Sequence, residues 1–200
     1  MTLMIKETIE IPKKVSDFLK ASGAKFELVE HKKVYTAYDK AATLKIKPSA
    51  VGKVLVMKVE NEPVIVIIGA DKNLDIEKIK KILKAKKIDF VPEIAIKEKF
   101  KGIDAGAIPP FGVVWKVKVL ADKGLLAQPK IVLSAGKYER SVRLTPAAFK
   151  KISPDLVVGF FSKAKEKKAK PKKKVAKIPA KKPTIGKKAG KPGQKTHKKK

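Results

Sequence analysis

The chain has no cysteine, and its 200 residues include only two histidines and one tryptophan. Without cysteine it can form no disulfide, no thiolate nucleophile and no cysteine-based zinc site. Of the two histidines, His31 and His197, the second lies in a lysine-rich C-terminal segment. A Ser-His-Asp triad would therefore depend on His31 alone, and a multi-histidine metal site is nearly excluded. We expect neither a metal nor a cofactor.

Acidic residues are also scarce, since 19 Asp and Glu stand against 49 Lys and Arg, which gives a formal net charge of +30. A charge of this size indicates a polyanionic partner. The sequence also lacks a long apolar run and a signal-peptide pattern after Met1. We therefore expect a soluble protein of the cytoplasm with no membrane partner.

The positive charge is concentrated in residues 163–200, which contain eighteen lysines and a single acidic residue, Glu166. Lysine, alanine and proline dominate there, and no apolar face is sustained. Such a segment cannot bury enough surface to offset its ordering entropy. We predict one domain over residues 1–162 and a disordered basic tail over 163–200. Contact with nucleic acid is the favoured interpretation of the tail, and a mere solubility tail is the alternative.

The order of predicted elements indicates an α+β fold, with a mixed β-sheet and surrounding helices. Apolar alternation or continuous apolar runs predict strands over 25–29, 52–60, 63–69, 88–91, 113–120, 130–134 and 140–144. Capping residues and helical spacing predict helices over 15–22, 36–44, 75–83, 92–100 and 145–152. The run Val64–Ile68 should be buried on both faces. Ala135-Gly136 should form a turn.

The stretch Gly102–Gly112 contains three glycines and two adjacent prolines in eleven residues. It cannot be a helix interior or a central strand. Glycine permits positive φ, whereas Pro109 and Pro110 fix their own φ and favour extended neighbours. We predict a stiff loop whose backbone amides can approach a ligand closely. A rigid surface connection is the alternative.

Several motifs follow one another between residues 25 and 154: Val29-Glu30-His31, 50–59, Gly69-Ala70-Asp71, 102–112, Ser134-Ala135-Gly136 and 141–146. In this order they resemble the trans-editing aminoacyl-tRNA deacylases, the YbaK-like relatives of the editing insertion domain of bacterial prolyl-tRNA synthetase. The basic tail lies outside the resemblance.

The resemblance implies a hydrolase that deacylates mischarged aminoacyl-tRNA, with tRNA as its partner. The essential lysine of the family matches Lys53, and Gly106 of the glycine-rich loop is the position nearest the substrate. The other implied substrate-binding positions are His31, Gly102, Ala107, Ile108, Pro109, Phe111, Gly112, Ser134, Ala135 and Gly136. Some family members carry a histidine near the small-residue turn that restricts substrate choice. This chain has none there, so no amino-acid specificity transfers.

The residues themselves allow this chemistry. Ester hydrolysis needs a water, a proton acceptor and a group that stabilises the developing oxyanion. The chain is poor in general bases, but the substrate brings functional groups that can assist the water. Amides of a glycine-rich loop can form an oxyanion hole, and a lysine can orient the phosphate or ribose of the tRNA end as a point charge.

Other interpretations stand beside these. Lys53 could be one of many surface lysines, His31 a strand-end histidine bonded to backbone, and Trp115 a core residue and not a stacking platform. The rival function is a non-catalytic tRNA- or DNA-binding protein that retains the fold. Because a pure binder needs neither Lys53 nor the glycine loop, the sequence favours the enzyme. The tail also suits an aminoacyl-tRNA synthetase or another nucleic acid as a further partner.

Overall fold

The computed structural model describes residues 10–165, so most of the predicted basic tail lies outside the described residues. The helices are α1 (Lys13–Ala21), α2 (Ala37–Thr43), η1 (Pro48–Ala50), α3 (Ile76–Leu83), α4 (Glu93–Lys99), α5 (Gly112–Trp115), α6 (Lys123–Leu126) and α7 (Pro146–Lys151). The strands are β1 (Phe26–Glu30), β2 (Gly52–Val59), β3 (Glu62–Gly69), β4 (Lys72–Leu74), β5 (Ile88–Phe90), β6 (Lys118–Asp122), β7 (Ile131–Lys137), β8 (Arg140–Leu144), β9 (Leu156–Gly159) and β10 (Ser162–Ala164).

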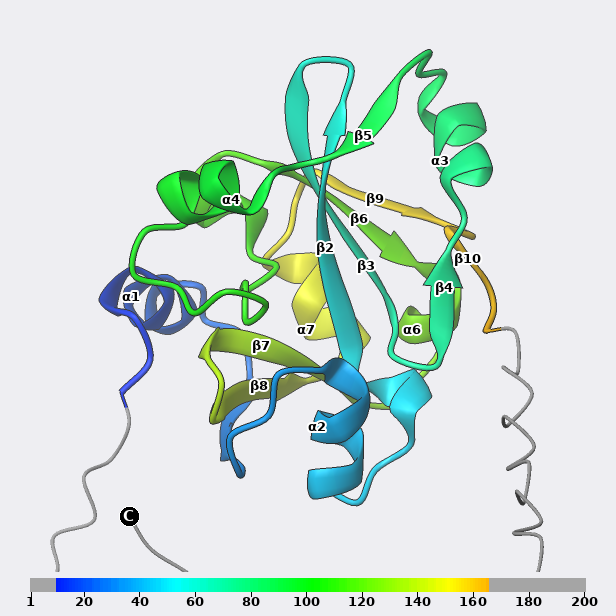
Figure 1. Ribbon diagram of the computed structural model, residues 1–200. Helices are drawn as coiled ribbons and strands as arrows, with labels where there is room; N and C mark the ends of the chain where they lie inside the picture. Colours follow the sequence, from blue (N-terminus) through cyan, green and yellow to red (C-terminus); the bar gives the residue numbers. More distant parts are fainter. Residues whose placement is uncertain (1–9, 166–200) are drawn as a thin grey trace, which may run out of the picture. The chain divides into compact units, whose positions relative to one another are not determined.

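The largest sheet has five strands in the order β5-β2-β3-β6-β9 (Figure 1). Strands β2 and β3 form the predicted antiparallel hairpin, whereas β3 pairs in parallel with β6 and β6 with β9. Residues Val64–Gly69 of β3 are all buried. Ile65 and Ile67 pack into one hydrophobic core, and Val66 and Ile68 pack into a second core. A strand with a core on each face cannot alternate, which explains its continuous aliphatic sequence.

A second sheet brings the start of β2 against β7. This sheet has three strands in the order β1-β8-β7, all antiparallel. Val51, just before β2, forms a bridge with Val132 of β7. A side chain at Gly52 would meet the Leu133 side chain at 2.5 Å, so glycine permits the close approach of the two strands. Within residues 10–165, α2, the start of β2 and β7 lie side by side (Figure 1).

Three of the predicted helix starts are confirmed by their capping hydrogen bonds. The side chains of Thr36, Asp75 and Thr145 accept from the backbone N–H three residues later, at the starts of α2, α3 and α7. The capping of α2 fixes where this helix begins, and α2 carries a lysine of the candidate site described below. The mixed five-stranded sheet and the interspersed helices confirm the α+β prediction.

The predicted strand over 113–120 is wrong in its first half. Gly112–Trp115 forms the single turn α5, and the strand begins only at Lys118. A Cβ at Gly112 would lie 2.1 Å from the carbonyl oxygen of Val117, so only glycine allows the chain to fold back this tightly. Trp115 packs against the core beside Phe100, with ring centroids 5.2 Å apart, which confirms its packing role.

The predicted turn at Ala135-Gly136 is also wrong. Strand β7 continues to Lys137, with an irregular register between Ser134 and Lys137, and the connection to β8 lies at Tyr138-Glu139. Gly136 has φ +99°. This conformation lets the strand bend without ending, as at a β-bulge. The small residues therefore shape a strand and not a turn.

The expected domain boundary between residues 162 and 163 falls inside β10. Ser162, Lys163 and Ala164 pair with Leu74, Asn73 and Lys72 of β4. Within residues 10–165, no helix is long and apolar enough to cross a bilayer.

Candidate functional site

A cavity of about 240 Å³ lies where α2, the start of β2, the 102–112 loop and the end of β7 meet. Residues far apart in the sequence line it: Val34, Tyr35, Thr36, Ala37, Lys40, Gly52, Lys53, Val54, Gly106, Ala107, Ser134, Lys137 and Tyr138. Four of the predicted site residues are thus brought together, namely Lys53, Gly106, Ala107 and Ser134. We call this space the lysine cavity, because three of its lining residues are lysines.

Lys53, the second residue of β2, is half-buried in the lysine cavity. Its Nζ donates a hydrogen bond of 2.6 Å to the carbonyl oxygen of Lys72. Burial lowers the pKa of Lys53, the positive charge of Lys165 lowers it further, and Asp71 opposes the shift. The ammonium is therefore anchored at the cavity by one hydrogen bond, and two donors remain for a ligand.

Lys40 of α2 is a second lysine of this cavity, and it is 5% exposed. Its Nζ donates a hydrogen bond of 2.9 Å to Ser134 Oγ. Burial lowers the pKa of Lys40 to about 8. Among residues 10–165 Lys40 forms no ion pair with a carboxylate. A buried, unpaired ammonium is costly to the fold, so its presence at a cavity indicates a role in the site.

Replacing Lys40 with methionine should stabilise the protein. The folded-state pKa of about 8 lies below the unfolded value of about 10.4, so burial of the charge costs roughly 3 kcal/mol at neutral pH. Loss of the Ser134 hydrogen bond offsets about 1 kcal/mol, which leaves a gain of about 2 kcal/mol. The unfolded chain retains this proton between pH 8 and 10.4, so wild-type stability should rise over that window. Chemical denaturation at pH 7 and pH 9.5 measures both effects.

The matched control is Lys20→Met, which removes an exposed lysine of α1. Its free energy of unfolding should stay within about 0.5 kcal/mol of the wild type. Equal pH dependence in the wild type and in Lys40→Met would show that Lys40 does not titrate in this window.

Gly106 and Ala107 of the glycine-rich loop line the cavity, and hydrogen bonds join this part of the loop to β7. Gly136 donates from its N–H to the Ala107 carbonyl and accepts from the Asp104 N–H, both at 3.0 Å. The Asp104 carboxylate also forms an ion pair of 3.3 Å with Lys137. Gly106 is exposed, has φ +84°, and its N–H donates to no group among residues 10–165. That amide is available to a ligand.

The second half of the loop belongs to the core. Ile108 and Phe111 are buried, and the Phe111 ring lies 5.6 Å from the ring of Phe18. Pro109 is buried as well, and Gly112 begins α5. Of the sequence-predicted site residues in this loop, Gly102, Ile108, Pro109, Phe111 and Gly112 do not line the lysine cavity. The four buried residues among them, Ile108, Pro109, Phe111 and Gly112, anchor the end of the loop, whereas Gly102 is exposed.

His31 does not line the lysine cavity either. It is 8% exposed, and its ring nitrogens hydrogen-bond to the Lys32 carbonyl and to Ser141 Oγ, both at 2.9 Å. Burial lowers the pKa of His31. These contacts agree with the alternative interpretation, in which His31 is a strand-end histidine bonded to backbone. Ala135 and Gly136 also lie outside the lining, although Gly136 fastens the loop.

Sequence reasoning missed Lys40, Tyr35 and Tyr138. Lys40 is one of many lysines, and only its place on the inner face of a short helix could have singled it out. The two tyrosines are separated by about a hundred residues, but their ring centroids lie 4.8 Å apart. Within residues 10–165, no carboxylate and no imidazole lines the cavity. Residues 10–165 hold no cluster of three or more metal-binding side chains.

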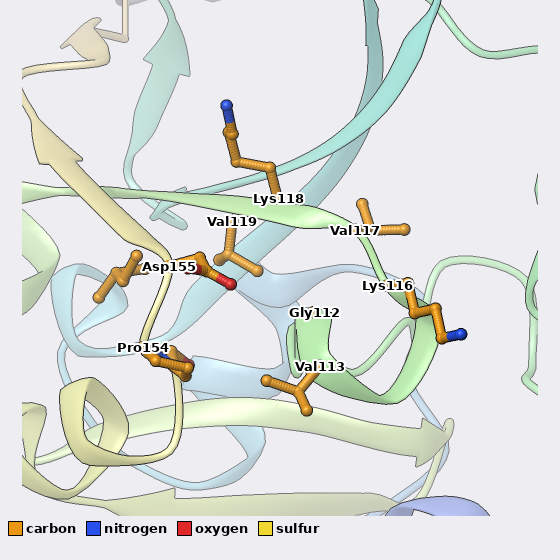
Figure 2. A pocket seen from close by; sticks show the side chains of 10 residues that line it. Gly112, Val113, Lys116, Val117, Lys118, Val119, Pro154 and Asp155 are labelled. Carbon is orange, nitrogen blue, oxygen red and sulfur yellow. The ribbon is translucent and has the colours of Figure 1, made fainter.

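A second and larger cavity, of about 670 Å³, lies beside α5 at the amino ends of β6 and β9. Figure 2 shows its lining, which is mainly apolar, with Lys116, Lys118 and Asp155 as its charged residues. Gly112 lines this space at the far end of the same loop. The larger cavity holds neither Lys53 nor Gly106. Of the implied site residues Gly112 lines it, whereas four line the smaller cavity.

An α+β domain with a small lysine-lined cavity is thus the class of protein that the geometry defines. Residues 31–152, which are more than half of the chain, match the model of the aminoacyl-tRNA editing domain. The chain therefore belongs to the aminoacyl-tRNA editing domain family. This confirms the resemblance inferred from the motifs and the expected enzyme class, an aminoacyl-tRNA deacylase.

Individual relatives agree with the family. The multifunctional Ser/Thr-tRNA deacylase ProXp-y of Escherichia coli (strain K12) is 29% identical over 168 residues, which cover 80% of this chain and 98% of that protein. The proline–tRNA ligase of Lysinibacillus sphaericus (strain C3-41) is 33% identical over 122 residues, which cover 58% of this chain and 21% of that enzyme. A solved structure of a proposed trans-editing enzyme for prolyl-tRNA synthetase shares the fold, with a TM-score of 0.68, 18% identity, and coverage of 78% of this chain and 100% of that one.

Proposed function

We propose that the lysine cavity is where this aminoacyl-tRNA deacylase hydrolyses the ester of mischarged tRNA. The observation that carries the proposal is that Lys53 and Gly106, which family resemblance implies for the site, line one small cavity. Pockets for drug-sized ligands measure roughly 300–1,000 Å³. At about 240 Å³ the lysine cavity suits the aminoacyl ester but leaves the nucleotides outside.

The chemistry follows from what lines the cavity. Because the described part of the chain places no carboxylate or imidazole there, we propose that the ribose hydroxyl beside the ester, or the amino group of the aminoacyl moiety, helps to activate the water. The free N–H of Gly106 is suited to donate to the oxyanion that forms as water attacks the carbonyl carbon. The alcohol of the terminal ribose then leaves, and the free amino acid is released.

Buried Lys40 and half-buried Lys53 both supply positive charge to the cavity in which this reaction is proposed. Lys53 has donors left for the ribose or the terminal phosphate, because only one is used by Lys72. Lys40 holds Ser134 Oγ in place, and its charge stabilises negative charge that develops in the cavity.

The size and polarity of the cavity favour a small, polar amino acid as the group removed. The Ser134 side chain offers a hydroxyl group at its wall, and the glycine at position 106 leaves space. The relative from Escherichia coli is named for serine and threonine. We propose the same class of substrate for this chain. We also propose that the protein acts in the cytoplasm, where tRNA is charged.

The experiment is to incubate the full chain with a panel of singly charged tRNAs and to follow release of amino acid. Tyrosyl- and phenylalanyl-tRNA serve as matched large substrates. We expect release from seryl- or threonyl-tRNA to be at least about tenfold faster than from the large substrates, a difference of about 1.4 kcal/mol. Binding of tRNA without release from any member of the panel would instead support the non-catalytic binder.

The basic tail, residues 163–200, is proposed to add electrostatic affinity for tRNA. We propose deletion of residues 167–200, which removes sixteen lysines and no acidic residue while it keeps β10. Each phosphate contact contributes a slope of about −0.9 on duplex, or about −0.7 on single strands, to the dependence of log affinity on log salt. The truncated protein should therefore bind tRNA more weakly and with a flatter salt dependence.

Because phosphate contacts carry no base or side-chain information, the truncated protein should keep the amino-acid preference of the full chain. Single-turnover deacylation against tRNA concentration, at several salt levels, measures both quantities. An unchanged salt slope would show that the tail does not contact tRNA phosphates. It would favour a synthetase as the partner of the tail. A changed amino-acid preference would show that the tail reaches the site.

A further inference from the structure

The chain has three tyrosines, and two of them line the lysine cavity. Tyr35 precedes α2, and Tyr138 follows β7 at the connection to β8. Tyr35 is 66% exposed, although a tyrosine ring normally buries much of its surface. A large aromatic ring held in solvent at the mouth of a functional cavity indicates a binding surface.

Contact with the Tyr138 ring holds the Tyr35 ring in place. It packs on the Tyr138 ring at a centroid distance of 4.8 Å with an interplanar angle of 67°. Tyr138 in turn donates from its hydroxyl to the Ala105 carbonyl and from its N–H to the Asp104 carboxylate, the latter at 3.0 Å. The ring pair is therefore tied to the same loop that presents Gly106.

A positive charge accompanies the two rings. Lys33 Nζ lies 6.0 Å from the Tyr35 ring centroid and 5.8 Å from that of Tyr138. Lys33 is exposed, and among residues 10–165 it forms no ion pair with a carboxylate. An exposed aromatic ring beside an unpaired lysine is the combination that binds single-stranded nucleic acid, because the ring stacks on a base and the lysine contacts a phosphate.

The dimensions of the cavity connect this surface to the substrate. If the ester occupies the lysine cavity, the unpaired nucleotides at the 3′ end of the tRNA must cross its rim, because the cavity has no room for them. We propose that Tyr35 is the platform on which an unpaired base of the tRNA 3′ end stacks, with Tyr138 as its brace and Lys33 as a phosphate contact. This proposal rests on the proposed function, and its test does not require catalysis.

The test uses a single-stranded RNA oligonucleotide with the sequence of a tRNA 3′ end and 2-aminopurine as its last base. Stacking on tyrosine quenches the fluorescence of this base, and anisotropy of a label at the other end reports affinity. Tyr35→Ala should weaken binding about tenfold and abolish the quenching, since base–aromatic stacking is a principal source of such affinity. Tyr35→Phe keeps the ring and should keep both signals.

The matched control is Phe90→Ala. Phe90 is 62% exposed, nearly as much as Tyr35, but it lies on β5 opposite Met57, away from the Gly52 end of β2. This variant should bind the oligonucleotide as the wild type does. Thermal unfolding of each variant checks that the fold is intact.

The outcomes test the proposed stacking on Tyr35 and the proposed deacylase activity separately. If Tyr35→Ala binds and quenches as the wild type does, the platform is wrong even if the protein deacylates tRNA. If the wild type releases no amino acid but the Tyr35 variants behave as expected, the platform stands and the proposed function fails. With charged tRNA as substrate, Tyr35→Ala should raise KM by a larger factor than it lowers kcat.

Discussion

Replacing Gly106 with valine should lower the single-turnover deacylation rate about 100-fold. Gly106 has φ +84°, a conformation that a β-branched residue avoids. To relieve this strain the loop must turn the Gly106 N–H away from its present direction. A side chain at this position would also project beside the Tyr35 carbonyl, which lies 3.8 Å from the ideal Cβ. Loss of one oxyanion donor alone typically costs about 10²–10³ in rate.

The same loop contains a matched control for backbone strain. Gly102 has φ +81°, and an added Cβ would meet nothing within 4 Å. Gly102→Val therefore strains the backbone equally, but outside the lysine cavity. Both variants should lose similar stability in thermal unfolding, and only Gly106→Val should lose activity of this magnitude. Equal activity of the two variants would show that the loop is only a connection and has no role in the reaction.

Replacing Lys53 with alanine should lower kcat/KM for deacylation at least about tenfold, which corresponds to about 1.4 kcal/mol of transition-state stabilisation. The ammonium is held at the cavity by the 2.6 Å hydrogen bond to the Lys72 carbonyl. Because its position is fixed before substrate binds, little ordering is needed when the ribose or phosphate arrives. Alanine leaves the β2–β3 ladder intact, so the fold should be retained.

Lys58→Ala is the control for Lys53, because Lys58 lies on the same strand and is exposed. Its removal changes the net charge of the protein by the same amount. A rate equal to that of the wild type is expected for Lys58→Ala. If Lys53→Ala also kept the wild-type rate, Lys53 would have no role in the reaction. If both variants lost activity equally, its role would be general electrostatic attraction and not action at the site.

The sequence predicted those parts of the fold that short-range physics decides. The β2–β3 hairpin, the buried aliphatic strand β3 and the caps Thr36, Asp75 and Thr145 depend on neighbouring residues, and all are confirmed. The errors at 113–117 and at Ala135-Gly136 arise at glycines whose backbone contacts residues beyond their immediate neighbours in the chain. Gly112 abuts the Val117 backbone, and Gly136 is held by Asp104 and Ala107.

The candidate site was predicted in part, through the family resemblance. Lys53, Gly106, Ala107 and Ser134, four of the positions that the resemblance implied, line one cavity, whereas His31 packs against Ser141 outside it; their roles stay a prediction. Lys40 could not be found among the lysines of the sequence, because its distinction is its burial against Ser134. The tyrosine pair depends on the fold, which brings the segment before α2 to the end of β7.

The proposed function places the aminoacyl ester in the lysine cavity and not in the larger cavity beside α5. The most direct measurement is a titration of ¹⁵N-labelled protein with a non-hydrolysable amide analogue of 3′-seryl-adenosine, followed by NMR. We expect saturable shifts of the backbone amides of Lys53, Gly106 and Ala107. Shifts confined to Val117, Lys118 and Leu156 would place the ligand in the larger cavity and contradict the proposed function.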